Sequence, residues 1–513
     1  MECELLIANA VIVDGTGRSR FSGNIAIDRG RIAAVGDTQG IVAGTTLDVS
    51  GMAVAPGFID VHVHSEKELV GGPDRWAGIK QGVTAQLIAP DGFSWAHLDG
   101  ALREEMRQYL EVFYGQTPKE WGGRTVREFL SLFEGRLPSH IVLQVPHGAI
   151  RAAVMGWSAA TADDGQLERM KAFVREWMEA GAAAFCTGLE YEPTVHADLR
   201  ELVELSKVTA KYGGIYVAHQ RGPSGHEPYG TEETLEIGKR AGIPVHISHF
   251  TVDDVQAETV RRGVEEGVDL SFDMYPYPAG CTHLLYYLPP WAQEGSPEQV
   301  KQRLASGRDR ERMSDYLMRA FPPHRLRCAT VKADKYKPYI GMMLSEIAEK
   351  ANMPLPELIC DMLLESDLQA LFIYHWDPAR EPFLEQTYRH PLHMVSTDGI
   401  FVQGSPHPRG YGTYPRILGS FVREQKWLSL EEAVRKMSGY PAERFGLKDR
   451  GVIAAGRAAD LVVFDPETVR SDATFANPRV DPVGIEHVLV DGRFVLKDGK
   501  VTGELPGQIL ARS

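Results

Sequence analysis

Two histidines one residue apart close an apolar segment, PGFIDVHVH at residues 56–64. Side chains alternate between the two faces of a strand, so His62 and His64 are expected to point the same way. Two imidazoles on one face at a strand end supply half of a transition-metal site. The alternative is a pair of structural histidines with satisfied hydrogen bonds, and this pattern alone does not separate the two interpretations.

Three more residues with metal-binding side chains follow apolar segments. His219 closes IYVAH, His249 closes VHISH, and Asp398 follows MVST just before a glycine. Each histidine taken alone is more often structural, but four imidazoles at three strand ends are better explained by a shared metal. A carboxylate beside them can bind the metal and accept a proton from water. The combination predicts metal-assisted hydrolysis.

The segments that carry these residues alternate with helical patterns. Short apolar runs have the length of strands, and longer amphipathic stretches such as 166–179 and 231–240 separate them. This alternation predicts a parallel α/β architecture. Histidines at strand ends favour a (β/α)8 TIM-type barrel over an open sheet, because barrel enzymes place catalytic groups at the C-terminal ends of strands. We expect a catalytic barrel over 56–449, with an insertion at about 285–345.

The two ends of the chain resemble each other. Residues 5–15 and 24–35 near the start, and 459–465 and 488–496 near the end, are β-branched runs separated by tight-turn residues. We expect residues 1–55 and 450–513 to form one small β-sandwich domain. Two unrelated hairpins are the alternative.

The composition excludes several classes of protein. With 55 Lys plus Arg against 69 Asp plus Glu, the formal net charge is −14, so a nucleic-acid partner is not expected. The five cysteines are widely spaced without a C-x-x-C pair, which indicates a reduced compartment. There is no apolar run of membrane-spanning length, and the acidic start does not look like a signal peptide. We expect a cytoplasmic protein with a small-molecule substrate and no membrane partner.

The order H-x-H, His, His, Asp resembles that of the amidohydrolase superfamily, and more narrowly the N-acyl-D-amino-acid deacylases (D-aminoacylases). The resemblance covers almost the whole chain. Its long motifs are PGFIDVHVH (56–64), GVTAQLIAPDGFS (82–94), TGLEYEP (187–193), AHQRG (218–222), HISHF (246–250), DMYPYPAGCT (273–282), STDG (396–399), HPRGYGTYPRILG (407–419), LSLEEAVRKMSGYPAERFGLKDRG (428–451) and GRAADLVVFDP (456–466).

The resemblance implies a role for each matching residue. His62, His64, His219 and His249 are implied as metal ligands, and Asp398 as a further ligand and the catalytic acid–base group. The family's carboxylate-gripping arginine maps to Arg409 and its substrate-contacting tyrosine to Tyr275. Cys281 stands where the family has a nearby serine. The implied cofactor is zinc, as one or two ions.

Two departures from the family pattern affect the substrate. The family usually has Asn-Cys-Gly where this chain has Pro90-Asp91-Gly92, so Asp91 replaces a cysteine ligand. As a harder oxygen donor, Asp91 can shift the preference toward another divalent metal; the alternatives are that the tripeptide is only a turn, or that Glu190 is the extra carboxylate. The family lysine after the second ligand histidine is also absent, since His249 is followed by Phe250 and Thr251.

The sequence therefore predicts a metal-dependent amidohydrolase that cleaves an N-acyl amino acid, of D configuration by resemblance, into a carboxylate and a free amino acid. Hydrolysis of a cyclic amide or imide, a dipeptide or another N-acyl compound on the same site is the alternative. A non-catalytic scaffold is a third reading, which the retention of all four histidines and Asp398 disfavours. The oligomeric state is left open.

Overall fold

The computed structural model describes residues 2–119, 121–222, 228–319 and 321–512. At its centre, six strands pair in parallel in the order β10 (Gln144–Pro146), β11 (Ala184–Gly188), β12 (Ile215–His219), β13 (Val245–Ile247), β14 (Leu270–Met274) and β18 (His393–Val395). A second parallel group contains β6 (Phe58–Asp60), β8 (Val83–Leu87) and β9 (His140–Val142). The alternating strands and helices confirm the predicted α/β class.

The two groups of parallel strands are connected directly along the chain, and the short strands that follow β6 and β18 pair with each other. Only Leu143 separates β9 from β10, and β19 (Gly399–Ile400) pairs with β7 (Val63–His64). The backbone N–H of Asp398 donates to the carbonyl of His62 at 2.8 Å. The last strands of the parallel series therefore lie directly beside the first.

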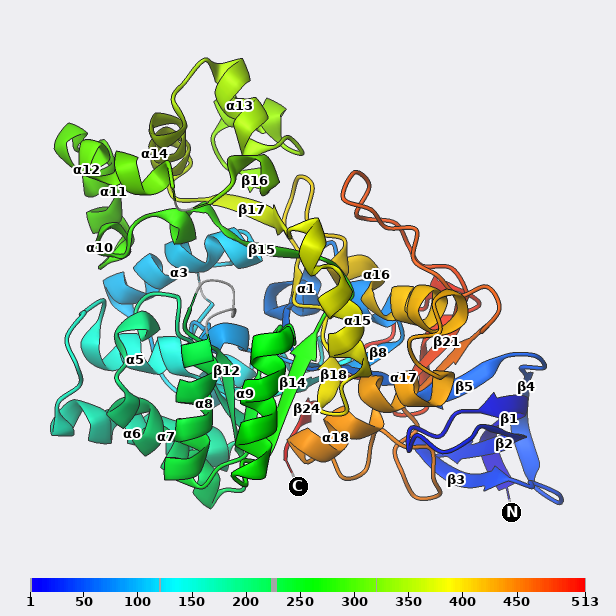
Figure 1. Cartoon of the computed structure of the whole chain (residues 1–513). Coiled ribbons are helices and arrows are strands. Elements are labelled where there is room, and N and C mark those ends of the chain that lie inside the picture. Colours follow the sequence, from blue (N-terminus) through cyan, green and yellow to red (C-terminus); the bar gives the residue numbers. More distant parts are fainter. Residues whose placement is uncertain (1, 120, 223–227, 320, 513) are drawn as a thin grey trace.

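Helices cover the outer side of these strands (Figure 1): α5 (His147–Met155), α6 (Asp164–Glu179), α7 (Leu199–Lys211), α8 (Pro228–Ala241) and α9 (Asp254–Glu265). Helix α6 shows why such segments form. Asp163 and Gln166 make a reciprocal capping box at its N-terminus, and its apolar positions Leu167, Met170, Val174 and Trp177 are all buried. The cap fixes where the helix begins, and the apolar stripe fixes which face meets the strands.

Both ends of the chain contribute to a nine-stranded sheet in the described structure, with the order β23-β22-β21-β20-β5-β1-β2-β3 and β4 paired to β1. Its strands are β1 (Glu2–Ile12), β2 (Phe21–Asp28), β3 (Arg31–Gly36), β4 (Val42–Asp48), β5 (Ala53–Pro56), β20 (Leu461–Phe464), β21 (Ile485–Val490), β22 (Arg493–Lys497) and β23 (Lys500–Val501). The final strand, β24 (Ile509–Leu510), leaves this sheet and pairs with β9 of the central group.

An antiparallel sheet and a set of helices project from the parallel strands, in green and yellow-green at the top of Figure 1. The sheet contains β15 (Ala279–His283), β17 (Ala370–His375) and β16 (Leu326–Val331), and the helices are α10 (Pro290–Gln293), α11 (Pro297–Ala305), α12 (Gly307–Leu317), α13 (Leu344–Ala351) and α14 (Leu355–Glu365). We call the stretch from Ala279 to His375 the excursion. It rests on α3 (Gly100–Tyr114), where Gln369 Nε2 donates to the carbonyl of Gln108 at 2.8 Å.

In the part of the chain that the structure describes, no helix has the length and apolar character needed to cross a membrane.

Candidate metal centre

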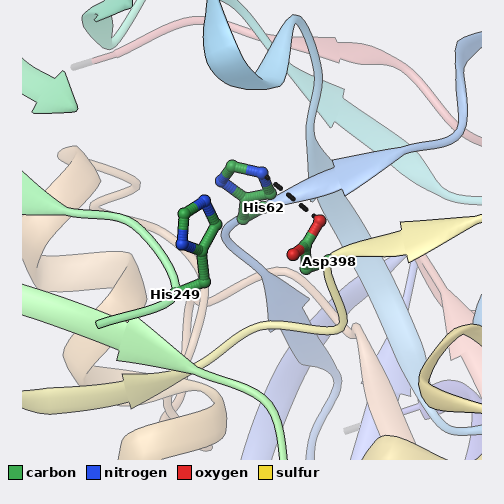
Figure 2. Close-up of side chains that lie close together, drawn as sticks. All are labelled: His62, His249 and Asp398. Carbon is green, nitrogen blue, oxygen red and sulfur yellow. Dashed lines mark ion pairs between the residues drawn. The ribbon is translucent and has the colours of Figure 1, made fainter. Parts of the chain in front are cut away.

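The metal-binding side chains singled out in the sequence converge at the C-terminal ends of the parallel strands. His62 lies between β6 and β7, His64 ends β7, His219 ends β12, His249 follows β13 and Asp398 follows β18. Together with Asp91 they form three overlapping groups, and within each group the ligand atoms lie within 4.8 Å of one another. Figure 2 shows His62, His249 and Asp398 turned toward a common space.

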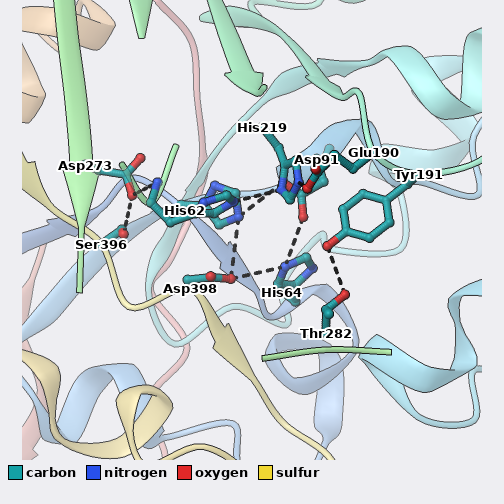
Figure 3. A network of polar contacts seen from close by, with 12 residues as sticks. His62, His64, Asp91, Glu190, Tyr191, His219, Asp273, Thr282, Ser396 and Asp398 are labelled. Atoms are coloured by element: carbon teal, nitrogen blue, oxygen red, sulfur yellow. Dashed lines mark hydrogen bonds and ion pairs between the residues drawn. The ribbon is translucent and has the colours of Figure 1, made fainter. Parts of the chain in front are cut away.

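Asp91 lies between the histidines from different strands (Figure 3). Its Oδ1 is 3.6 Å from His62 Nε2 and 3.5 Å from His219 Nδ1, and its Oδ2 is 3.6 Å from His64 Nε2. Asp398 Oδ1 is 3.6 Å from His62 Nε2 and 3.5 Å from His64 Nε2. Two ligand atoms that are each about 2.0–2.2 Å from a tetrahedral ion are about 3.3–3.6 Å apart. These spacings are those of donors around a shared cation.

Unpartnered buried atoms point to the same conclusion. Nε2 of His62 and Oδ1 of Asp91 are buried and have no hydrogen-bond partner among the described residues. Buried polar atoms are normally paired, so a buried atom without a protein partner needs an explanation, such as a role as a metal ligand. The set of four imidazoles and two carboxylates suits zinc or another divalent transition metal. The residues present therefore fit a metal.

The segment around Asp91 is a short 3-10 turn, η1 (Pro90–Gly92). A side chain at Gly92, where φ is +73°, would lie 2.8 Å from the carbonyl oxygen of Cys186, so glycine is required there. The tripeptide is thus both a tight turn and the carrier of a carboxylate that faces the histidines.

Three of the six donors have a left-handed backbone, with φ of 56° at Asp91, 38° at His249 and 45° at Asp398. Such a conformation is unfavourable for residues other than glycine and persists only where the surroundings impose it. The N–H of His249 donates to Asp273 Oδ1 at 3.0 Å, which helps to hold that turn. The fold therefore places these donors in advance of any ligand.

Two buried aspartates that the sequence analysis did not single out support the centre. Asp60 accepts hydrogen bonds from the N–H of Thr397 at 2.9 Å and from its hydroxyl at 2.5 Å, which ties β6 to the residue before Asp398. Burial raises the pKa of Asp60 to about 7, although the Thr397 hydrogen bonds oppose the increase. Asp273 Oδ2 lies 2.8 Å from His246 Nε2, and Oδ1 of the same residue accepts the hydrogen bond from the His249 N–H. The signal for both was an acidic residue inside an apolar strand.

Glu190 lies on the outer side of His219. Its Oε2 is 2.9 Å from His219 Nε2, and its Oε1 accepts a hydrogen bond from the Tyr286 hydroxyl at 3.1 Å. The other ring nitrogen of His219 faces Asp91 and lies 2.9 Å from His249 Nε2. Burial opposes the charged imidazole, but Asp91 and Glu190 outweigh it and raise the pKa of His219 to about 10. Glu190 therefore orients a donor and is not grouped with the donors themselves.

Arg409, at the start of α16 (Arg409–Arg416), is fully buried beside Asp398. Its Nη2 is 2.9 Å from Asp398 Oδ2, and its guanidinium lies 4.4 Å from the centre of the Tyr275 ring. Burial disfavours ionisation of Asp398, but Arg409 and the facing histidines hold its pKa well below the usual range. Nε and Nη1 of Arg409 lack a hydrogen-bond partner among the described residues.

A cavity opens onto these groups. The donors His64, Asp91, His219, His249 and Asp398 line it together with Tyr275 and Cys281. Burial raises the pKa of the Cys281 thiol to about 12, so the thiol stays neutral. Other parts of the wall include Phe113, Tyr191 and the excursion residues Tyr286 and Tyr287. The sequence did not single them out, because nothing local distinguishes a wall aromatic from a core aromatic.

A second acidic group with a histidine is already occupied by a cation. His140, Asp460 and Asp491 lie close together, and Arg450 Nη1 is 3.0 Å from Asp491 Oδ1 and also pairs with Asp460. The guanidinium supplies the positive charge that a metal would bring. This group links the central strands to the terminal sheet.

Comparison with known proteins identifies the class first. The model of the Amidohydrolase family matches residues 383–496. D-aminoacylase of Alcaligenes xylosoxydans xylosoxydans is 31% identical over 527 residues, which is 99% of this chain and 98% of the relative. N-acyl-D-glutamate deacylase of the same organism is also 31% identical, over 99% of this chain and 96% of the relative.

A solved structure agrees with these relatives. The N-acyl-D-glutamate deacylase of Bordetella bronchiseptica, complexed with zinc and a phosphonate inhibitor that mimics the tetrahedral intermediate, superposes with a TM-score of 0.84 at 29% identity, covering 100% of both chains. The protein is thus an amidohydrolase, a hydrolase of carbon–nitrogen bonds other than peptide bonds. Within that class, the chain belongs to the D-aminoacylase family of N-acyl-D-amino-acid deacylases.

Proposed function

We propose that this protein hydrolyses the amide bond of N-acyl-D-amino acids to a carboxylate and a free D-amino acid. The observation that carries the proposal is the convergence of four imidazoles and two carboxylates, five of which line one cavity, with a buried guanidinium beside them. The family relatives support the substrate class. Two of them, a D-aminoacylase and an N-acyl-D-glutamate deacylase, are equally similar to this chain.

The four histidines, Asp91 and Asp398 would hold the metal, as one ion or two. When bound, zinc or another divalent cation acts as a Lewis acid that makes water more acidic and the substrate carbonyl more electrophilic. Asp91 lies between the His62–His64 pair and His219, so its carboxylate can act as a ligand together with histidines from both sides. Its oxygen donors widen the range of metals beyond the thiophilic ones.

Asp398 would act as the proton carrier. Oδ1 faces His62 and His64, whereas Oδ2 faces Arg409, so one oxygen remains directed at the reacting centre. The carboxylate is ionised at neutral pH and can accept a proton from the attacking water. It can then return that proton to the nitrogen of the leaving amine, as one group acting first as base and then as acid.

Arg409 and Tyr275 would position the substrate. A guanidinium suits a carboxylate because it can donate two parallel hydrogen bonds, and Arg409 has unpartnered donors beside the cavity. The Tyr275 ring supports the guanidinium face, and the neutral Cys281 lies close by on β15. Holding the α-carboxylate at this end places the amide over the donors.

The test compares paired N-acetyl-D- and N-acetyl-L-amino acids with the zinc-loaded protein and its Asp398→Asn variant. We expect D-selective hydrolysis in the wild type and a kcat at least about 1000-fold lower in the variant, with metal content unchanged. Retained turnover in Asp398→Asn removes the proton-carrier role. Activity on cyclic amides or dipeptides alone would replace the proposed substrate class.

We also propose the finer architecture. The central parallel strands are taken as a (β/α)8 barrel over 56–449, since β19 pairs with β7 and the series returns to its start. Residues 1–55 and 450–513 are taken as a separate β-sandwich, because apolar side chains from both chain ends share one core, among them Ile7, Ile25, Leu461 and Val463. The five cysteines are free, which suits a reducing cytoplasm.

A further inference from the structure

Apart from Glu190, the wall of the cavity away from the donors is uncharged and largely aromatic. The excursion contributes Tyr286 and Tyr287 from one turn and Tyr374 from β17. Other uncharged residues line the wall as well, among them Phe113, Tyr191, Phe250, Thr251, Trp376 and Ile400. A neutral side chain that enters this space gains free energy in proportion to the apolar surface that it removes from water.

The charges that line the cavity are mostly negative. Asp91, Glu190 and Asp398 face it, whereas none of its described lining residues is a lysine or an arginine. Arg409 lies beside Tyr275 at one end of the cavity, where the proposed function assigns it to the α-carboxylate. Two more arginines touch wall residues from outside and face acidic partners of their own. Arg380 lies 5.8 Å from the Trp376 ring and 3.7 Å from Asp253, and Arg325 beside Tyr374 donates to Asp377 at 2.6 Å. The residues outside the described part (1, 120, 223–227, 320 and 513) are also neither lysine nor arginine in the sequence.

The nearest cation in the adjoining hollow is committed elsewhere. Arg221 lines that hollow, which shares Glu190, Tyr286, Tyr287 and Tyr374 with the cavity. Its Nε lies 2.9 Å from Glu233, and Nη1 donates to the carbonyl of Val195 at 2.5 Å. The Arg221 guanidinium is therefore already hydrogen-bonded within the protein and is not positioned to bind a substrate carboxylate.

A substrate with two carboxylates would satisfy only one of them. The α-carboxylate uses Arg409, so a side-chain carboxylate would face a wall that offers no lysine or arginine and to which Glu190 adds a negative charge. Burying an unpaired charge is strongly unfavourable, and a like charge nearby adds to the penalty. Turning the substrate in the cavity does not help, because the rest of the wall is neutral.

We propose that the enzyme is selective for N-acyl-D-amino acids with uncharged side chains, apolar and aromatic ones above all, and discriminates against N-acyl-D-aspartate and N-acyl-D-glutamate. This inference rests on the proposed function. The identity of the relatives does not decide the point, since the chain is 31% identical both to the D-aminoacylase and to the N-acyl-D-glutamate deacylase. The selectivity is inferred instead from the absence of lysine and arginine among the described residues that line the cavity.

The experiment measures kcat/KM of the zinc-loaded enzyme for N-acetyl-D-glutamine, N-acetyl-D-glutamate and N-acetyl-D-methionine. Glutamine and glutamate have nearly the same shape, so their ratio isolates the charge. We expect glutamine and methionine to exceed glutamate by at least about 100-fold, as for a pocket that leaves a charged group unpaired. A Thr251→Lys variant, which adds a cation to the wall, should reduce that ratio at least about tenfold. The uncharged Thr251→Met variant, of similar side-chain length, should change glutamine and glutamate alike.

Each outcome bears on a separate claim. Equal or better use of N-acetyl-D-glutamate by the wild type overturns the selectivity and leaves the proposed function standing. A ratio that Thr251→Lys and Thr251→Met shift equally also overturns it, because charge is then not the cause. If no N-acyl amino acid is hydrolysed, the proposed function fails. Calorimetric binding of paired phosphonates carrying glutamine or glutamate side chains then decides the selectivity by itself: tighter binding of the glutamine analogue supports it, and equal binding overturns it.

Discussion

Replacing Glu190 by glutamine should weaken metal binding although Glu190 does not belong to the donor groups. Its Oε2 lies 2.9 Å from the outer nitrogen of His219, so the opposite nitrogen faces Asp91 and the centre. A carboxylate on the outer nitrogen fixes the tautomer and orientation of a metal-binding histidine and increases its basicity. Glutamine keeps an oxygen acceptor in the same place and removes only the charge.

The expected size of the effect follows from the electrostatics of His219. Its pKa rises from 6.5 to about 10 in spite of burial, with Asp91 contributing more than Glu190. Glu190 therefore strengthens the ring as an electron donor but is not its main carboxylate partner. Loss of such an outer partner of a metal-binding histidine typically costs about 10- to 100-fold in metal affinity, which is about 1.4–2.8 kcal/mol. We expect zinc affinity to fall about tenfold in Glu190→Gln, and up to about 100-fold in Glu190→Ala.

The assay is competition for zinc between the purified metal-free protein and a chromophoric chelator, at fixed pH and ionic strength. Tyr286→Phe is the matched control. It removes the hydroxyl that donates to Glu190 Oε1 at 3.1 Å and keeps the carboxylate beside His219, so its affinity should fall less than about threefold. Thermal unfolding of the metal-free variants separates a local effect from a loss of folding.

An unchanged zinc dissociation constant in both Glu190 variants, with the fold intact, would falsify the orienting role. A larger loss in Tyr286→Phe than in Glu190→Gln would also contradict it, because the hydroxyl contacts the Glu190 carboxylate, which in turn contacts His219. Loss of one complete metal equivalent in Glu190→Gln would instead make Glu190 a direct ligand.

Three further changes test other parts of the site. Asp91→Ala should lower bound metal by at least one equivalent or weaken it about 100-fold, as measured by elemental analysis; unchanged content would leave η1 as a turn only. Arg409→Ala should raise KM about 100-fold for carboxylate-bearing substrates and much less for N-acyl amines, and equal losses for both would make Arg409 structural. Burial lowers the pKa of Lys436 to about 8, against about 10.4 in an unfolded chain, so the unfolded state binds more protons between these values. The free energy of unfolding of the wild type should therefore rise relative to Lys436→Met by about 2–3 kcal/mol from pH 8 to 10, and a constant difference across that range would refute the assignment.

The candidate metal donors could be picked out in the sequence because their signal is local. An imidazole at the end of an apolar strand can be recognised within five residues, and the strand period places His62 and His64 on one face. The structure brings all six predicted donors together. The turn around Asp91 also had a local signal, although whether its side chain faces the histidines depends on the packing of Gly92 against Cys186.

The contacts made by the polar groups that support the centre had no such local signal. The pair between Arg409 and Asp398, and the hydrogen bonds of Asp60 to Thr397, join strands and helices whose relative positions are set by packing across the whole molecule. The same is true of Glu190, which sequence analysis raised as a further carboxylate and which the structure places on the outer nitrogen of His219.

The sequence by itself determined the order of strands and helices, the α/β class and the residues that offer metal-binding atoms, since each of these follows from periodicity and side-chain chemistry within a short window. Only the tertiary structure decided which carboxylate bridges the histidines, which one orients them and how the excursion from Ala279 to His375 makes the neutral wall of the cavity. The physical reason is distance along the chain. Contacts such as Tyr286 to Glu190 join segments far apart in sequence, and their geometry is set by how every intervening strand and helix packs.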